Sequence, residues 1–415
     1  MSSTHALSPD ATVADRLSTF PSTLTDVFAA VHDPRSRQRR RFTVAALLTL
    51  AVAAMLATHL SPFAIAQWGA EQDAASKQAM GFPKGVTPHQ STFHRLFRRL
   101  DPALLSAVLT DHGAANVSPG TAVRGAAGVA FDGKAQRGRL ACATTAGCPV
   151  HALSAYAHEA AVVLAQVEIV GDAEKAEAEV TVAPRLIARL DWRGRVLTGD
   201  ALFCQRTLCA QVGDAGGDYL LIVKENQPQL SRDIATLFAS RADAALRAAS
   251  LPTWDMRETT TVNKGHGRVE VRHLVASTAL NDYLDWPGVA QVLMIERVWW
   301  EHGERHEAVR HGITSLPPAV ADAERLLTLV RGHWQIENGL HYVKDVTLGE
   351  DRSLIHTGNG PSIMAILRDT VVSLLHHAGW RTIAARLRYY SGHPKEVLAF
   401  LGIPLAENAY ALAPQ

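Results

Sequence analysis

The chain has 415 residues, of which 47% are hydrophobic and 20% are charged, and its formal net charge is +1. This composition excludes a disordered or low-complexity protein and provides enough apolar side chains for two or three folded domains. The near-zero net charge neither favours nor excludes nucleic acid as a partner. The four cysteines are not spaced like the ligands of an ordinary zinc site, and they are typical of free thiols in a cytosolic chain.

The N-terminal segment is polar and lacks the apolar stretch of a signal peptide. The most apolar run, Val44–Ala57, is too short to cross a bilayer, and it predicts a buried helix. We therefore expect a cytoplasmic protein that has no membrane partner.

Residues 1–115 are predicted to be helical and contain two arginine-rich segments, at 35–41 and 95–100. Such clusters are either solvated surface or the footprint of a phosphate-binding site. The functional interpretation is a helical DNA-binding domain in which Arg39, Arg40 and Arg41 contact phosphates. A plain helical bundle with a basic surface explains the pattern nearly as well.

After residue 125 the pattern changes to short apolar strands and helices. Two of these strands end in aspartates, Asp132 and Asp200, and a hairpin pattern at 151–169 lies between them. Strands that alternate with helices in this way predict an α/β domain with a mixed sheet over residues 125–250.

A further apolar strand in this region ends in the sequence KENQ, followed by Pro228. A simple turn before a helix that starts at the proline explains this sequence. The functional alternative is that Lys224, Asn226 and Gln227 contact DNA beside the strand ends.

Residues 251–315 contain four strand-like segments separated by glycine or proline turns, which predict an antiparallel β insertion. Helical patterning then resumes over residues 316–380. Residues 381–415 are interpreted as a C-terminal tail.

The helix that begins after the insertion carries His333, Glu337, His341 and Lys344 at spacings of four, four and three, which places them on one face. A solvated face is the ordinary explanation for such a stripe. A zinc site made by His333, Glu337 and His341 is another, but the sequence lacks the HExxH motif of zinc hydrolases.

Carboxylates at the ends of neighbouring strands converge at one edge of a sheet, where they can hold a divalent metal. Oxygen ligands suit Mg²⁺ or Mn²⁺. Glu337 could add a third carboxylate to Asp132 and Asp200 and complete a two-metal site. Asp345 or the pair Glu350–Asp351 could supply the third acid instead.

Eight motifs follow one another between about Asp33 and His377: DPRSRQRRR, STFHRLFRRLDP, FDGKAQRG, LSAYAHE, LTGDALFCQ, GGDYLLIVKENQPQL, GHGRVEVR and RGHWQIENGLHYVKDVTLGEDRS. In content and order they resemble the motifs of the DDE insertion-sequence transposases, specifically the H-repeat-associated, ISAs-type branch.

The resemblance implies a ribonuclease-H-like catalytic core, preceded by the N-terminal helical domain, with a β insertion between the second and third acids. By motif, it implies that Asp132, Asp200 and Glu337 are catalytic and hold two Mg²⁺ or Mn²⁺ ions. Lys344, seven residues after the glutamate, fits a Glu-x6-Lys element and is expected to contact a DNA phosphate.

Two departures from the family pattern affect these expectations. The arginine that relatives carry four residues before the glutamate is His333 here, and Arg331 is expected to take part of that role at the DNA. The K-S/T-N-E-I element is AEAEV at 176–180, which keeps Glu179 and replaces the lysine and asparagine by alanine.

The function implied is that of a transposase that binds terminal inverted repeats and catalyses DNA cleavage and strand transfer by in-line phosphoryl transfer. Its expected partners are double-stranded DNA, at the element ends and at the target, and further copies of the chain in a homodimer or higher oligomer. The alternative is a catalytically decayed or domesticated DNA-binding protein derived from such a transposase.

Overall fold

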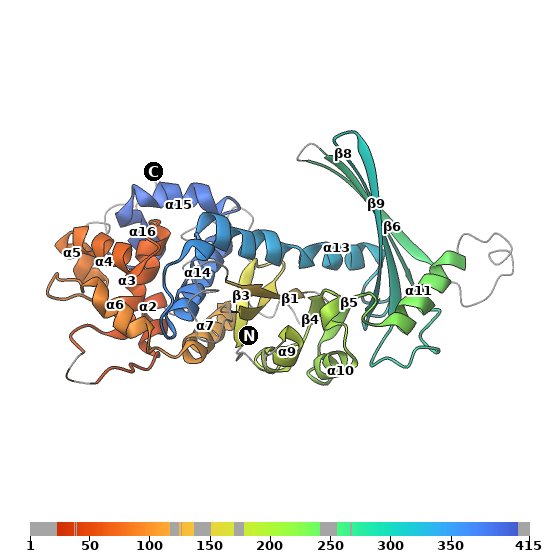
Figure 1. Cartoon of the computed structure of the whole chain (residues 1–415), viewed down its shortest axis with the longest axis horizontal. Helices are drawn as coiled ribbons and strands as arrows, with labels where there is room; N and C mark the ends of the chain where they lie inside the picture. Colours follow the sequence, from red (N-terminus) through yellow and green to blue (C-terminus); the bar gives the residue numbers. More distant parts are fainter. Residues whose placement is uncertain are drawn as a thin grey trace, which may run out of the picture.

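The computed structural model describes residues 23–36, 38, 40–116, 124–125, 127–136, 151–169, 178–240, 255–265 and 268–405. In Figure 1 a lobe of helices from both halves of the chain lies at one end of the molecule. A sheet occupies the middle and continues into long strands at the other end.

The described strands form one mixed sheet of nine strands, in the order β3-β2-β1-β4-β5-β9-β8-β7-β6. Strand β2 pairs antiparallel with both of its neighbours, whereas β1, β4 and β5 run parallel to one another. The predicted mixed α/β sheet is therefore confirmed. The strands of this first part are β1 (Ala127–Ala135), β2 (His151–Ala157), β3 (Val162–Ile169), β4 (Arg195–Gly199) and β5 (Asp218–Val223).

The β insertion is an extension of this sheet, because its last strand pairs antiparallel with β5. Its four strands form an antiparallel meander that projects away from the helical lobe (Figure 1). The predicted antiparallel arrangement is present, and three of the four strands are longer than the sequence pattern indicated. They are β6 (Arg257–Gly265), β7 (Arg268–Ser277), β8 (Gln291–Glu301) and β9 (Glu304–Thr314).

The two faces of the sheet are covered by different helices. Alternate side chains of a strand point to opposite faces, so Val129 and Phe131 join the core beneath one face, whereas Ala130 lies on the other face. The first face packs against helices α9 (Glu179–Ile187), α10 (Arg206–Asp214) and α11 (Pro228–Ser240). Helix α13 (Ala323–His333) covers the second face.

The chain continues from α13 into two π-helical segments, η3 (Ile336–His341) and η4 (Val343–Thr347). The sequence predicted a regular α-helix here. A π-helical turn contains an additional residue, so the side chains that follow Ile336 are rotated away from the positions that a regular helix would give them. Short 3₁₀ helices occur at η2 (Ala201–Phe203) and η5 (Glu350–Arg352).

The helical lobe is built around α3 (Val44–Leu56), in which all residues but one are buried. This confirms the prediction of a buried helix from the apolar run. Among the described helices, none is long and apolar enough to cross a membrane. The surrounding helices are α2 (Leu24–Ala29), α4 (Pro62–Glu71), α5 (Ala74–Ala79), α6 (Gln90–Phe97), α7 (Pro102–Asn116) and α14 (Gly360–His377).

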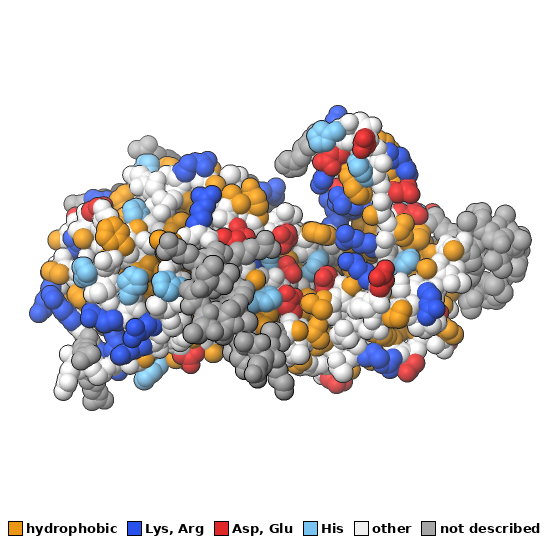
Figure 2. Space-filling model, in the orientation of Figure 1, with side chains coloured by type: hydrophobic (Ala, Val, Ile, Leu, Met, Phe, Trp, Pro, Cys, Tyr) orange, Lys and Arg blue, Asp and Glu red, His pale blue; other side chains and the backbone are white. Residues whose placement is uncertain are grey.

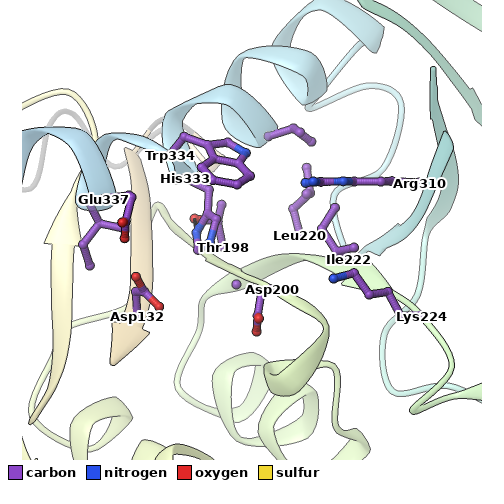
Figure 3. A pocket seen from close by; sticks show the side chains of 13 residues that line it. Asp132, Thr198, Asp200, Leu220, Ile222, Lys224, Arg310, His333, Trp334 and Glu337 are labelled. Atoms are coloured by element: carbon purple, nitrogen blue, oxygen red, sulfur yellow. Dashed lines mark hydrogen bonds between the residues drawn. The ribbon is translucent and has the colours of Figure 1, made fainter. Parts of the chain in front are cut away.

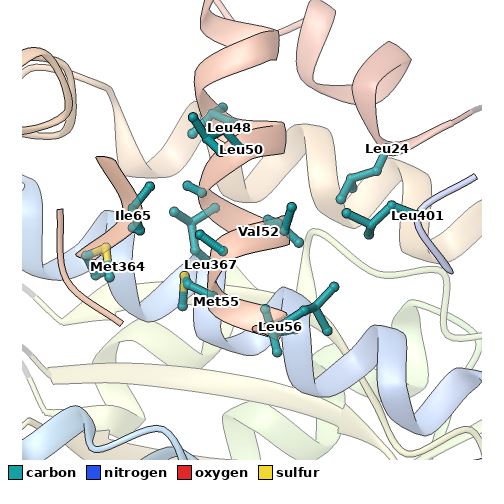
Figure 4. Close-up of a cluster of buried hydrophobic side chains, with 14 of the residues drawn as sticks. Leu24, Leu48, Leu50, Val52, Met55, Leu56, Ile65, Met364, Leu367 and Leu401 are labelled. Atoms are coloured by element: carbon teal, nitrogen blue, oxygen red, sulfur yellow. The ribbon is translucent and has the colours of Figure 1, made fainter. Parts of the chain in front are cut away.

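The C-terminal part of the chain belongs to this lobe. Residues interpreted as a tail form helices α15 (Ile383–Ser391) and α16 (Pro394–Phe400). Leu387 and Leu398 are buried in the same core as α3, and Figure 4 shows Leu401 facing Leu24 there. The two ends of the described chain therefore fold together, and the apolar positions of α15 and α16 have this core as their partner.

A buried histidine fixes helix α13 on the sheet. His158 lies between Gly128 of β1 and Gly332 of α13, and a Cβ atom built on either glycine would lie 2.2 Å from its Nδ1. Since real Cβ atoms do not approach a ring so closely, both positions require glycine for the helix to lie at this depth.

Gly332→Ala tests this packing. We expect the added methyl to push α13 off His158 and to lower the free energy of unfolding by roughly 1–3 kcal/mol, as overpacking does. Gly213→Ala in α10 is the matched control, because nothing lies within 4 Å of its Cβ position. It should leave stability unchanged or raise it by up to about 1 kcal/mol. Equal unfolding midpoints for the two variants in a urea titration would contradict the proposed contact.

Candidate active site

Strand β1 directs two charged side chains toward the face covered by α13 and the π-helical segments. Asp132 and Lys134 are two residues apart and therefore share that face. The Lys134 ammonium lies 2.6 Å from a carboxylate oxygen of Asp345 in η4. Asp132 lies on the same face as Ala130, next to β4.

Asp200 directly follows β4, as predicted, and begins the short helix η2. Its Oδ1 accepts a hydrogen bond of 2.9 Å from the backbone N–H of Leu202, so the carboxylate caps the turn. Two amides hold the segment that follows it. The Asn226 side chain donates to the carbonyl of Ala201, and Gln227 donates to the carbonyl of Cys204.

Glu337 lies on η3, and a buried imidazole connects it to β1. The Nδ1 atom of His341 is 3.3 Å from Asp132 Oδ2 and 3.4 Å from Glu337 Oε2. Burial disfavours the charged imidazole, but its hydrogen bonds to the two carboxylates outweigh burial and raise the pKa of His341. The same hydrogen bond lowers the pKa of Glu337. The imidazole thus links the two acids, and through them it joins η3 to β1.

Asp132, Asp200 and Glu337 line one open pocket of about 260 Å³ between β1, β4, β5 and α13. Figure 3 shows Glu337 above Asp132 on one side of the pocket, and Lys224 with Arg310 on the opposite side. The cations therefore face the acids across the pocket. The lining residues are Asp132, Thr198, Gly199, Asp200, Leu220, Ile222, Lys224, Arg310, Val330, His333, Trp334, Ile336 and Glu337.

The acids offer ligand atoms for a metal ion. Asp132, Glu337 and His341 each offer one ligand atom, and these three atoms lie within 4.8 Å of one another. Asp200 lines the same pocket but is not in this group, and its carboxylate is turned toward η2 (Figure 3). His333 is also outside the group, so the three residues of the zinc alternative do not come together in the described structure.

A family model described as the transposase DDE domain matches residues 128–375, which contain this pocket. The chain belongs to the DDE transposase family. A second family model, described as DDE_Tnp_1-associated, matches residues 25–112 in the helical lobe.

Two relatives agree with this family and with the resemblance inferred from the motifs. "Putative transposase YncI" of Escherichia coli O157:H7 is 26% identical over 361 residues, which cover 85% of this chain and 87% of that protein. "H repeat-associated putative transposase YhhI" of Escherichia coli K12 is 29% identical over 255 residues, which cover 60% of this chain and 63% of that protein.

A cryo-EM structure of the piggyBac transposase synaptic complex with hairpin DNA is similar to this chain with a TM-score of 0.42 and 10% sequence identity. The similarity covers 97% of this chain and 82% of that chain. Its score is too low to support a conclusion about fold or function.

Lys344 of this transposase is buried, in disagreement with the predicted phosphate contact. Its ammonium lies 2.8 Å from Asp369 and 3.5 Å from Glu350. Burial disfavours its charge, but these two carboxylates outweigh burial and raise the pKa of Lys344. The physical reason for the different placement is the π-helical geometry, which turns Lys344 away from the face of Glu337 and toward α14.

The rival third acids have other partners. Glu350 is completely buried and lies near both Lys344 and Arg368, so it balances charge inside the protein. Asp345 pairs with Lys134. Asp351 is on η5 and does not line the pocket. Of the candidate third acids, Glu337 is the one that lines the pocket with Asp132 and Asp200.

The predicted DNA-contacting residues lie in two regions. Lys224 and His333 line the pocket, and the exposed Arg331 donates to Asn263 of β6. Arg40 and Arg41 are on the helical lobe, and Arg39 lies outside the described residues.

Sequence reasoning did not single out Arg310 or His158. Arg310 reaches the pocket from β9, where its guanidinium lies 5.5 Å from the centre of the Trp334 ring. His158 bonds Thr198, 2.9 Å away, and the Thr198 hydroxyl is 3.4 Å from His333. Burial lowers the pKa of His158 to about 3, so it is neutral at physiological pH. No local pattern indicates either contact, because both depend on strand register.

The burial of Lys344 generates a prediction about stability. Lys344→Met keeps the side-chain volume but leaves Asp369 and Glu350 without their closest cation. Removing one partner of a buried ion pair costs about 3–5 kcal/mol of stability. Lys224→Met, at an exposed lysine of the pocket, should unfold like the wild type. Chemical denaturation followed by circular dichroism measures both.

The same pair of variants separates the structural role from a DNA contact. If Lys344→Met unfolds like the wild type but loses affinity for DNA, Lys344 contacts phosphate. Its ion pair with Asp369 would then not be what stabilises the fold.

Proposed function

We propose that this chain is the transposase of an insertion sequence, which binds the terminal inverted repeats of its element and catalyses cleavage and strand transfer of DNA. The observation that supports this function most directly is that Asp132, Asp200 and Glu337, which are far apart in the sequence, line one pocket. The strand order β3-β2-β1-β4-β5, with β1, β4 and β5 parallel, supports a ribonuclease-H-like core for the catalytic part.

The donor set fits hard divalent cations, which take carboxylate oxygens and retain positions for water and phosphate. In this proposal Asp132, Asp200 and Glu337 hold two Mg²⁺ or Mn²⁺ ions. When bound, such ions stabilise the charge of the phosphate during in-line displacement and lower the pKa of the attacking water or 3′-hydroxyl.

The other residues of the pocket position the acids and attract the substrate. His341 sets the separation of Asp132 and Glu337, because it is buried and lies within 3.4 Å of both. Lys224 and Arg310 present positive charge on the opposite side (Figure 3). A phosphodiester between these two sides would meet cations from β5 and β9 while its reacting atoms face the acids.

The proposed partner is double-stranded DNA, first at the element ends and then at the target. Phosphates beyond the pocket would meet the β insertion, where Arg331 bonds Asn263 at the edge of α13. Action on two ends at once requires more than one active site, so we propose a homodimer or a larger assembly on DNA.

Neutralising the three acids tests the catalytic proposal. Asp132→Asn, Asp200→Asn and Glu337→Gln preserve shape and remove charge, so each should weaken Mn²⁺ binding in a calorimetric titration. Loss of charge stabilisation at the phosphate should slow cleavage on the order of a thousandfold or more. DNA binding should persist, because each change removes a negative charge near phosphate. The substrate is DNA that carries the ends of the element.

Asp351→Asn is the control for these variants, since that carboxylate does not line the pocket. It should cleave at the wild-type rate. Wild-type cleavage by all three acid variants would refute the site, whereas wild-type protein that binds the ends without cleaving them in Mg²⁺ would favour the decayed DNA-binding protein.

The amides after β5 generate a second test. Asn226 and Gln227 bond the backbone that follows Asp200, so we expect them to act on cleavage through the placement of that acid. The double variant Asn226→Ala/Gln227→Ala should cleave DNA at least tenfold more slowly, a barrier increase of about 1.4 kcal/mol, and should bind DNA with unchanged affinity. Gln229→Ala, at an exposed amide in the first turn of α11, should leave both cleavage and DNA affinity unchanged.

Loss of DNA affinity in the double variant, with normal cleavage once the DNA is saturating, would instead indicate that these amides contact DNA directly. That outcome would reject the positioning role.

A further inference from the structure

The helical lobe contains a second pocket, about 570 Å³ in volume, at which the two arginine-rich segments of the sequence meet. Figure 2 shows Lys and Arg side chains gathered on this end of the molecule, in the region where Figure 1 places α6. The pocket is lined by Arg35, Ser36, Arg41, Phe42, Thr87, Pro88, His89, Ser91, Thr92, Arg95 and Arg99.

One wall of the pocket is the segment that precedes α3, and internal ion pairs fix its shape. Arg35 is buried, bonds both carboxylate oxygens of Asp33 at 2.9 Å, and donates to the carbonyl of Phe42. Arg40 donates to the carbonyls of Arg35 and Asp33. These two arginines thus hold the segment in place. Arg41, which has no described carboxylate partner, is left to line the pocket.

The other wall is helix α6, the residues before it and Arg99, which lies two residues after its end. Arg95 and Arg99 are four residues apart and lie on the same side of the chain, and Ser91 lies one turn before them, 3.5 Å from Arg95. Like charges held close together repel one another. Among the described residues that line the pocket there is no carboxylate to offset them. An anion from outside would therefore complete the site.

We propose that this pocket binds backbone phosphates of duplex DNA, as a contact separate from the catalytic pocket. Arginine guanidinium groups match phosphate oxygens with paired hydrogen bonds, and the hydroxyls of Ser91 and Thr92 supply neutral donors beside them. The choice of DNA as the polyanion rests on the proposed function. The charge, the concave shape and the hydroxyls of the pocket do not depend on it.

In this proposal the arginines of the first cluster have different tasks. Of the three consecutive arginines predicted to contact DNA, Arg40 serves the internal structure and Arg41 lines the pocket, together with Arg95 and Arg99 from the other cluster.

The test measures the affinity of the full-length protein for a short labelled duplex of arbitrary sequence, by fluorescence anisotropy over a series of salt concentrations. Each phosphate contact contributes about 0.9 to the slope of log affinity against log salt. We expect Arg95→Gln/Arg99→Gln to reduce that slope by about two and to weaken binding roughly tenfold or more near physiological salt. Ser91→Asp, which places a carboxylate beside Arg95, should weaken binding as well.

Arg381→Gln/Arg388→Gln is the matched control. It removes the same charge from exposed arginines at α15, which lies on the other side of the lobe in Figure 1. This variant should retain the wild-type slope. Equal slopes for the two double variants, or an unchanged slope for Arg95→Gln/Arg99→Gln in a protein with a wild-type unfolding midpoint, would overturn the proposal.

Two further measurements separate this inference from the proposed function. Asp132→Asn should bind the duplex with the wild-type salt slope. The phosphate site can therefore be tested in a protein that does not cleave DNA. Anionic vesicles and single-stranded DNA should compete poorly with the duplex, and stronger binding of either would reject duplex DNA as the ligand. If the wild-type protein never cleaves DNA but Arg95→Gln/Arg99→Gln shows the predicted change of slope, this inference is retained and the catalytic one is lost.

Discussion

The contact of His158 with helix α13 is the constraint on which the candidate active site depends. Gly128 and Gly332 allow the helix to lie against β1 at a depth that any other residue would prevent. From that position the chain continues into η3, so Glu337 arrives beside Asp132. His158 also bonds Thr198, whose hydroxyl reaches His333 in the pocket. A neutral, buried imidazole therefore determines where an exposed carboxylate lies, although it is not itself part of the pocket.

Charge is balanced in two layers beneath that carboxylate. Close to the pocket, His341 lies between Asp132 and Glu337 and Lys134 pairs with Asp345. Deeper in the protein, Lys344 and Arg368 lie near Glu350 and Asp369. Buried ion pairs contribute little net stability compared with apolar packing, but breaking one is costly. The arrangement therefore favours a single orientation of the π-helical segments relative to β1 and α14, as a precise catalytic geometry requires.

The sequence predicted the elements that are set by local periodicity. The apolar strand before Asp200, the buried helix α3 and the antiparallel insertion all follow from alternation or apolar length. The strand predicted to end at Asp132 continues to Ala135, because residues 133–135 pair with β2. The failures occurred where long-range contacts decide the outcome. A regular helical period placed Lys344 on the face of Glu337, whereas π-helical turns direct it into the protein. Helices α15 and α16 looked like a tail because their partner, α3, lies more than three hundred residues earlier. Arg310 reaches the pocket through the pairing of β9 with β5, which no local pattern shows.

The net charge of +1 conceals how unevenly the cations are used. Arg35 and Arg40 hold a segment of the helical lobe together, and Lys344 neutralises buried acids. Arg41, Arg95 and Arg99 gather in one pocket, while Lys224 and Arg310 face the acids in another. Phosphate affinity depends on cations that no carboxylate of the protein has already neutralised. An arginine cluster in a sequence is therefore not in itself a DNA-binding surface. Here Arg35 and Arg40 bond within their own segment, whereas Arg41 lines a pocket. The other arginines that line this pocket, Arg95 and Arg99, lie some fifty residues further along the chain.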